Sequence, residues 1–266
     1  MRKYLGLFKI SFQQEFVYRL NFIMWRVRNV LQILVAYFLW TTLFIGGGKI
    51  FGYDKNQILT YIFGVLIVRA LVLSSRAIDV AGDINSGDLT LSLLKPINFF
   101  KYWLTRDFST KALNLFFAFF ETLFLVLVLK VPFFFQTNFS FLLPFSFSLV
   151  LAILIFFFLV LLIDMVTFWA PEMQWAGQFI FLAIITEFLS GAIFPLDILP
   201  QALQKVIYFL PFPYLIFFPV QIYLGKLALV NTLGGIMVEG FWVITLSLIV
   251  NFIWKKGLLR YEAVGR

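Results

Sequence analysis

The chain has 266 residues, of which 62% are hydrophobic and only 13% are charged, about half the charged fraction of roughly 25% that soluble globular domains carry. This composition excludes a soluble domain. Since a helix needs roughly 20 residues to cross a bilayer, the length holds about six or seven spans and leaves no room for a large domain outside the membrane. The absence of Cys and His excludes disulfides, thiol nucleophiles and imidazole acid–base catalysis.

The net charge of +8 fits the basic cytoplasmic loops of membrane proteins better than a nucleic-acid-binding surface. With six spans and both termini in the cytoplasm, the inner segments hold fifteen Lys and Arg residues and the outer segments hold five. A seventh span would place the basic C-terminal tail outside, against this asymmetry. We therefore expect an all-α integral protein of the cell (plasma) membrane, with six transmembrane helices, a retained N-terminus and no nucleic-acid partner.

Residues 1–25 are predicted to form an amphipathic helix that lies in the lipid headgroup region. Their apolar residues recur at spacings of three and four, which is typical of a helix with one apolar face; they are Leu5, Phe8, Phe12, Phe16, Leu20 and Ile23. An alternative is that this helix only extends the first span into the cytoplasm. The first span itself is expected at residues 29–48.

The other five spans are expected at residues 55–76, 112–129, 141–163, 173–190 and 231–254. Arg69 interrupts the second span close to its inner end, from where its side chain can extend to the headgroups. Between the fifth and sixth spans, prolines break an apolar stretch so often that one straight helix is excluded; they are Pro195, Pro200, Pro211, Pro213 and Pro219. Residues 191–225 are therefore predicted to form short re-entrant helices on the outer side.

Three glutamates fall within the predicted spans, where ionisable residues are candidates for function. Glu121 lies near the middle of the third span and should be protonated or paired within the protein. Glu187 is expected near the outer end of the fifth span and Glu239 about two turns into the sixth. One interpretation is a purely structural hydrogen bond between helices. The other is that Glu187 and Glu239 meet near the outer mouth of a transport path and act in export.

The longest polar stretch, residues 76–111, is expected to be an inner loop that docks on a cytoplasmic protein. It combines a short helix-competent segment, a Ser-Gly turn and a proline stop with more apolar residues than a solvated loop needs. The residues expected to make the contact are Asp79, Asp83, Ile84, Gly87, Asp88, Leu89, Lys95 and Pro96.

No catalytic, cofactor or metal site is expected in this chain. Gly46 to Lys49 resembles the end of a phosphate-binding loop, but the preceding glycine and the following Ser or Thr are missing, because Leu43 and Ile50 stand there. The carboxylates Asp79, Asp83 and Asp88 are interspersed with Lys and Arg and are expected to face water or a partner. Two alternatives remain open: an ion-coupled transporter that uses Glu121, Glu187 and Glu239, and a membrane enzyme.

In several segments taken together, the sequence resembles the membrane subunits of ABC-2 type transporters. The resemblance rests on the amphipathic N-terminal stretch, DINSGDL and LLKPI within 83–97, SGAIFPLDILP at 190–200, LPFPYLIFFPVQIYLGK at 210–226 and GLLRYEAVG at 257–265. It implies a single transmembrane domain over 1–266, a permease of an exporter that pairs with a second permease copy or a paralogue in the lipid bilayer. It also implies that residues 76–111 are a coupling segment seated on a separate ATPase, which binds ATP and Mg²⁺.

Overall fold

The computed structural model describes residues 2–15 and 19–261, and nearly all of this part of the chain is helical. Its long helices are α1 (Arg2–Glu15), α2 (Arg19–Leu43), α3 (Lys55–Val72), α6 (Phe99–Leu129), α7 (Phe139–Asp164) and α12 (Leu229–Arg260). Within the described residues the only β pairing is a bridge between Ile50 and Tyr53. The all-α prediction is confirmed.

Among the described residues, five helices are long and apolar enough to cross a membrane. They cover Arg26–Gly46, Lys55–Val72, Phe99–Leu129, Phe139–Phe168 and Leu229–Arg260. The predicted fifth span, residues 173–190, is also helical but is divided into α8 (Gln174–Gln178), the π-helix η5 (Phe179–Thr186) and α9 (Glu187–Leu189). In η5 the Thr186 hydroxyl donates to the Phe181 carbonyl, five residues back, at 2.9 Å.

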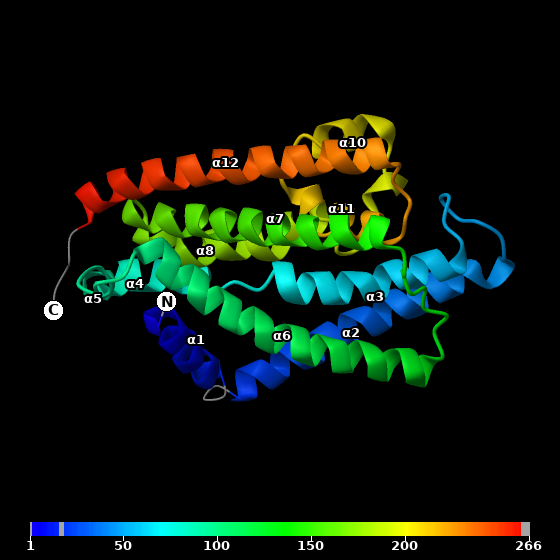
Figure 1. The fold of residues 1–266 in the computed structure, drawn as a ribbon, viewed down its shortest axis with the longest axis horizontal. Helices are drawn as coiled ribbons and strands as arrows, with labels where there is room; N and C mark the ends of the chain where they lie inside the picture. Colours follow the sequence, from blue (N-terminus) through cyan, green and yellow to red (C-terminus); the bar gives the residue numbers. More distant parts are fainter. Residues whose placement is uncertain (1, 16–18, 262–266) are drawn as a thin grey trace.

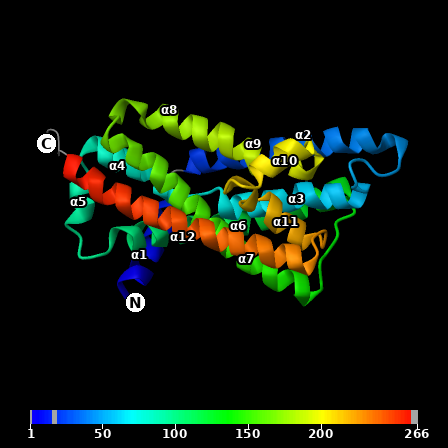
Figure 2. The same ribbon diagram turned by 90° about the horizontal axis from the view of Figure 1, so that it is seen from above.

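Helices α3, α7 and α12 run roughly along the longest axis of the molecule, α2 and α6 are inclined to it, and α1 crosses it obliquely (Figure 1). α12 packs on α7, α6 packs on α3, and α1 packs on the first part of α6. The short helices α4 (Val80–Ser86) and α5 (Leu89–Leu93), together with the C-terminal part of α12, lie at one end of the molecule, which we call the α4–α5 end (Figures 1 and 2). The 3₁₀ turn η1 (Phe44–Gly46) and the loop before α3 lie at the opposite end.

Two predicted boundaries at the polar segments are wrong. The N-terminal helix ends at Glu15 rather than at residue 25, and a second helix that begins at Arg19 continues into the first span; residues 16–18 lie outside the described chain. The segment 76–111 is a loop only in its first part, because α6 already begins at Phe99. The Asn98 side chain caps α6 by accepting a hydrogen bond from the Lys101 amide at 3.1 Å.

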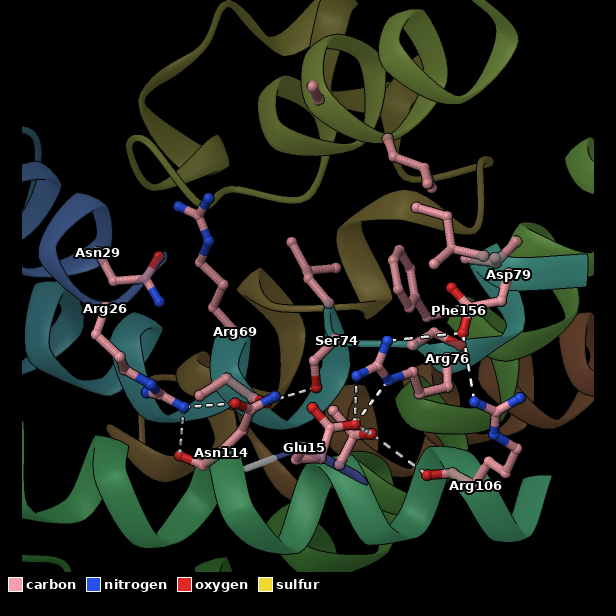
Figure 3. A pocket seen from close by; sticks show the side chains of 18 of the residues that line it. Glu15, Arg26, Asn29, Arg69, Ser74, Arg76, Asp79, Arg106, Asn114 and Phe156 are labelled. Carbon is pink, nitrogen blue, oxygen red and sulfur yellow. Dashed lines mark hydrogen bonds and ion pairs between the residues drawn. The ribbon is translucent and has the colours of Figure 1, made fainter. Parts of the chain in front are cut away.

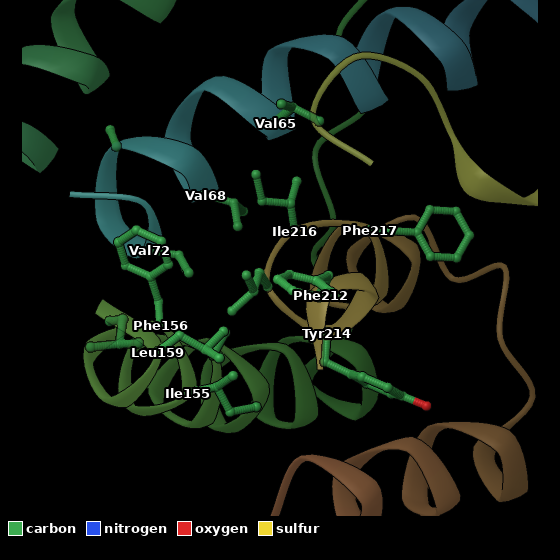
Figure 4. Close-up of a cluster of buried hydrophobic side chains, with 14 of the residues drawn as sticks. Val65, Val68, Val72, Ile155, Phe156, Leu159, Phe212, Tyr214, Ile216 and Phe217 are labelled. Carbon is green, nitrogen blue, oxygen red and sulfur yellow. The ribbon is translucent and has the colours of Figure 1, made fainter. Parts of the chain in front are cut away.

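The apolar core lies between α3, α7 and residues 191–225, which we call the proline-rich region (Figure 4). Val68 and Val72 of α3 face Phe156 and Leu159 of α7, and Ile216 fills the space beside them. The prolines divide the proline-rich region into α10 (Gln201–Ile207), the 3₁₀ turn η7 (Phe212–Tyr214) and α11 (Phe217–Tyr223), as the sequence predicts.

The turn after α9 depends on a glycine. Gly191 has φ +80°, and a Cβ atom there would overlap the side chain of Phe217. Its carbonyl accepts a hydrogen bond from the Tyr61 hydroxyl at 2.6 Å, and the Ser190 carbonyl accepts one from the Phe217 amide at 2.9 Å. The chain therefore leaves α9 abruptly, so that the helix formed by α8, η5 and α9 ends partway along the molecule (Figure 2).

Candidate functional site

A cavity of about 970 Å³ lies between α1, α2, α3, α6, α7 and the helix formed by η5 and α9. Five arginines line it: Arg26, Arg28, Arg69, Arg76 and Arg106 (Figure 3). Three carboxylates also line it, namely those of Glu15, Asp79 and Glu187. Five positive charges against three negative ones leave the lining with a net charge of +2. On the other side the wall is apolar and comes from α7 and η5.

A network of ion pairs holds one end of the cavity together. Arg76 contacts Glu15 at 2.6 Å, and Glu15 also accepts a hydrogen bond from the Thr110 hydroxyl at 2.8 Å. The Asp79 carboxylate lies 3.6 Å from the guanidinium groups of both Arg76 and Arg106. This network joins α1, the 3₁₀ turn η2 (Arg76–Asp79) and α6, three segments that are far apart in the sequence (Figure 3).

Arg69 and Glu187 form an ion pair at the middle of the cavity wall. The sequence analysis placed Arg69 near the inner end of its span and Glu187 near the outer end of its own, and the two placements are incompatible with this contact. Glu187 does lie near the end of its helix, which ends at Leu189 as the predicted boundary of 190 requires. That end, however, lies partway along the molecule and close to the end of α3 (Figure 2), which is why Glu187 reaches Arg69.

Glu121 is paired, which was one of its two expected states. Its carboxylate lies 3.3 Å from the Arg26 guanidinium, which also donates to the side-chain oxygen of Asn114 at 2.5 Å. Both side chains are mostly buried. Arg26 therefore lines the cavity, and the negative charge of Glu121 compensates the positive charge of Arg26.

Glu239 lies elsewhere, in the contact between α12 and α7. It is fully buried, and its Oε1 accepts a hydrogen bond from the Ser148 hydroxyl at 2.7 Å. Its other oxygen has no hydrogen-bond partner among the described residues. The structure thus gives Glu187 and Glu239 different partners and does not bring them together as expected, because α9 ends beside α3 rather than beside α12.

In the predicted coupling segment, two of the residues expected to contact a partner are buried in the chain's own core. Ile84 is 6% exposed, because the apolar face of α4 packs against α7 and the 3₁₀ turn η3 (Met165–Phe168). Leu89, the first residue of α5, is fully buried, whereas Leu91 (60%) and Leu94 (76%), on α5 and at its end, are exposed. The exposed apolar side chains of this segment therefore include Leu91 and Leu94 and not Ile84 or Leu89.

Hydrogen bonds fix the coupling segment to the start of α8. The Asn85 side chain donates to Gln174 at 3.0 Å, and the Gln178 side chain donates to the carbonyl of Ile78 and the carboxylate of Asp164, each at 2.9 Å. The segment is therefore attached to the helix that carries Glu187.

A second attachment joins the coupling segment to the end of α12. The Tyr261 hydroxyl donates to the Gly87 carbonyl at 2.8 Å and lies 3.1 Å from the Thr90 hydroxyl. Gly87 has φ +83°, a conformation that separates α4 from α5 and that favours glycine. The predicted turn at Ser86 and Gly87 is present.

The remaining predicted contact residues lie around this turn. Asp83 is half-buried, and burial raises the pKa of its carboxyl group although nearby Arg106 opposes the rise. Asp88 accepts a hydrogen bond from the Ser86 hydroxyl at 2.8 Å. The ammonium group of Lys95 lies 4.8 Å from the centre of the Tyr102 ring, and Pro96 is exposed.

Residues 30–265 match the family model described as "ABC-2 family transporter protein". The chain belongs to this family. The match covers the predicted coupling segment and the part of the cavity lining that follows residue 30. It confirms the resemblance and the expectation of a membrane-embedded transport permease. A comparison with curated proteins finds no match.

This ABC-2 family protein also contains a feature that the sequence analysis missed, namely the grouping of its arginines around one cavity. Arg26, Arg69 and Arg106 were counted there only as topology signals or membrane-end charges. One sequence feature could have indicated the cavity: Arg69 interrupts an apolar span, and charged residues within spans usually face the protein interior or a water-filled cavity. Among the described residues no group of three His, Cys, Asp or Glu side chains has metal-binding geometry.

Proposed function

We propose that this chain is a permease subunit of an ATP-driven ABC-type exporter. Two such subunits, identical or paralogous, form the transport path in the lipid bilayer, and a separate ATPase subunit binds and hydrolyses ATP with Mg²⁺. The observation that carries the proposal is the attachment of the coupling segment to both sides of the bundle. It is bonded to α8 through Gln174 and Gln178 and to α12 through Tyr261.

The coupling segment also reaches the cavity. Asp79 belongs to the cavity lining and precedes α4, whereas Leu91 and Leu94 are exposed on α5. A displacement of α5 by the ATPase therefore acts on α4, on the ion pairs of Asp79 and on the start of α8. The helix that begins with α8 continues through η5 to Glu187. The same displacement therefore moves Glu187 relative to Arg69 and strains the ion pair between them, which forms part of the cavity lining.

The six-span arrangement is part of the proposal. The α8–η5–α9 helix provides the fifth span and α10 and α11 lie on the outer side, with both termini and the α4–α5 end in the cytoplasm. Because the chain has no Cys, single cysteines report topology directly. Cysteines at the exposed positions Lys49 and Gln201 should react with an impermeant maleimide from outside, and one at exposed Lys101 should react only after permeabilisation. Reaction of Gln201→Cys from the cytoplasmic side alone would overturn this arrangement.

The proposed coupling is tested by co-expressing this chain with ABC ATPase subunits from the same organism and co-purifying them. Wild-type permease should retain the ATPase, and Leu91→Glu with Leu94→Glu should release it, because a charge placed in an apolar contact is desolvated without a partner. Leu259→Glu is the matched control, since Leu259 is an exposed leucine of α12 at the same end of the molecule. Equal retention by all three proteins would overturn the proposed contact surface.

The alternative of an ion-coupled transporter gains no support from the three glutamates. Glu121 and Glu187 are each paired with an arginine, and Glu239 accepts a hydrogen bond from Ser148. A cation would have to displace an arginine to occupy either of the first two sites. The coupling segment has no role in such a mechanism.

A further inference from the structure

The lining of the arginine-lined cavity has a charged part and an apolar part. The arginines come from α2 (Arg26 and Arg28), α3 (Arg69) and α6 (Arg106), among other elements. Apolar side chains come from α7 and η5, and they include Phe156 and Leu182. A ligand that contacts both the arginines and the apolar side chains of the lining needs an anionic group joined to an aliphatic chain.

The ion pairs do not use up the hydrogen-bonding capacity of these arginines. A guanidinium group has five N–H donors in a planar arrangement that matches the oxygens of phosphate or carboxylate. Among the described residues, Arg69 forms an ion pair with Glu187 and Arg106 forms one with Asp79, and neither pair occupies all five donors of its guanidinium group. Donors therefore remain for a ligand, and the hydroxyl of Ser74 and the amide of Asn29 also line the space.

The helix on the apolar side is irregular where it meets the cavity. Leu182 and Ala183 belong to the π-helix η5, and Glu187 follows it directly. Segments of π-helix are rare and occur frequently at functional sites, because the wider turn changes which side chains face one direction. The segment that departs from α-helical geometry is thus the one that forms the apolar wall.

We propose that this cavity binds an amphiphile with a phosphate-type anionic headgroup, the headgroup at the arginines and the chain along α7 and η5. The proposal rests on the proposed function, for which it names the substrate class. A volume of about 970 Å³ is at the upper end of the range for drug-sized ligands, which is roughly 300–1,000 Å³. A headgroup and the first part of an alkyl chain therefore fit inside it.

Binding to the full-length permease in nanodiscs tests the proposal without the ATPase, so its failure is separable from failure of the proposed function. Dodecyl phosphate should bind saturably. Dodecylphosphocholine, which has the same chain but a zwitterionic headgroup, and inorganic phosphate, which has no chain, should each bind at least about tenfold more weakly. Equal binding of dodecyl phosphate and dodecylphosphocholine would overturn the anionic headgroup, and equal binding of inorganic phosphate would overturn the apolar wall.

Arg28 is exposed while it lines the cavity, so the proposal predicts an effect of reversing its charge. Arg28→Glu should weaken dodecyl phosphate binding by about tenfold or more, and an unchanged Tm of the variant checks that the fold is intact. Arg260→Glu, the same change at an exposed arginine of α12 outside the cavity lining, should change the affinity less than about twofold. Equal losses in both variants would mean non-specific electrostatic attraction and would overturn the site.

The source of the amphiphile is distinguished by competition. Phosphatidic acid in the nanodisc bilayer should displace dodecyl phosphate if the natural ligand is a membrane lipid. Retention of dodecyl phosphate in the presence of phosphatidic acid would instead identify a water-soluble amphiphile. Phosphatidylcholine is the matched bilayer control, and displacement by it would overturn headgroup selection.

Discussion

Arg69 and Glu187 form an ion pair that joins α3 to the helix formed by α8, η5 and α9. The two side chains are 18% and 13% exposed, so most of the pair is removed from water. Both helices end within a few residues of the pair, at Val72 and Leu189. The contact is thus the point at which two helices that enter from opposite ends of the molecule meet.

Removing one partner of this pair should cost more than removing both. A buried charge without its partner costs roughly 3–5 kcal/mol, whereas a neutral replacement of both partners is much milder. Glu187→Gln alone should therefore lower the Tm of the purified permease by roughly 5 °C or more, and Arg69→Gln combined with Glu187→Gln should recover most of that loss. Equal Tm values for the single and double variants in a thermal unfolding assay would contradict the pairing.

At Glu239, the structure predicts that an amide can replace the carboxyl group. The Ser148 hydroxyl donates to Oε1 of Glu239, and a glutamine oxygen accepts the same hydrogen bond. Glu239→Gln should therefore accumulate in the membrane and export like the wild type. Glu239→Lys should fail to accumulate, because an ammonium group without a partner, buried between α7 and α12, costs roughly 3–5 kcal/mol. Loss of export by a stable Glu239→Gln protein would show a role in transport instead.

Gly257 is predicted to be essential for packing the end of α12. A Cβ atom at this position would overlap the ring of Phe168, whereas nothing lies within 4 Å of the corresponding position at Gly240. Gly257→Ala should lower stability by roughly 1–3 kcal/mol through overpacking, and Gly240→Ala should not. Adding Phe168→Leu to Gly257→Ala should restore part of the lost Tm. An unchanged Tm for Gly257→Ala would contradict the packing of α12 on η3.

Asp83 is expected to make stability depend on pH. Burial raises its folded-state pKa above 3.8, so the folded protein holds this proton more tightly than the unfolded chain, and stability falls as the pH rises through the raised pKa. Asp83→Asn lacks this penalty and should have a higher Tm than the wild type at pH 7. The Tm difference should shrink as the pH is lowered toward 4, and a difference that does not depend on pH would contradict the burial of the carboxylate.

The sequence predicted the helical class, most spans and the broken proline-rich region because apolar length and proline chemistry are local signals. Arg69 and Glu187 show where local reasoning stops. Each was placed from its distance to the end of an apolar stretch, but the end of α9 is set by Gly191, whose φ of +80° is held by contacts with Tyr61 and Phe217. Those contacts join residues that are far apart in the sequence, so the apolar stretch 173–190 alone does not predict them.

The coupling segment also shows that a local sequence pattern does not predict tertiary packing, here for individual side chains. Its apolar residues were correctly recognised as too many for a solvated loop, yet the sequence did not separate those that pack inward from those that face outward. Ile84 and Leu89 pack against the bundle while Leu91 and Leu94 stay exposed. Leu89 and Leu91 stand two positions apart on the short helix α5 and therefore lie on different faces of it.

The most direct test of the account is a cross-link from α5 to the ATPase. Leu94→Cys, labelled with a benzophenone maleimide in this cysteine-free chain, should cross-link to the co-expressed ATPase on illumination, since Leu94 is 76% exposed at the end of α5. Ile45→Cys, at an 81% exposed position at the opposite end of the molecule, is the control and should give no ATPase adduct. An adduct at position 94 alone is the predicted result, and its absence there, or an equal yield at position 45, would contradict the coupling of this permease through α5.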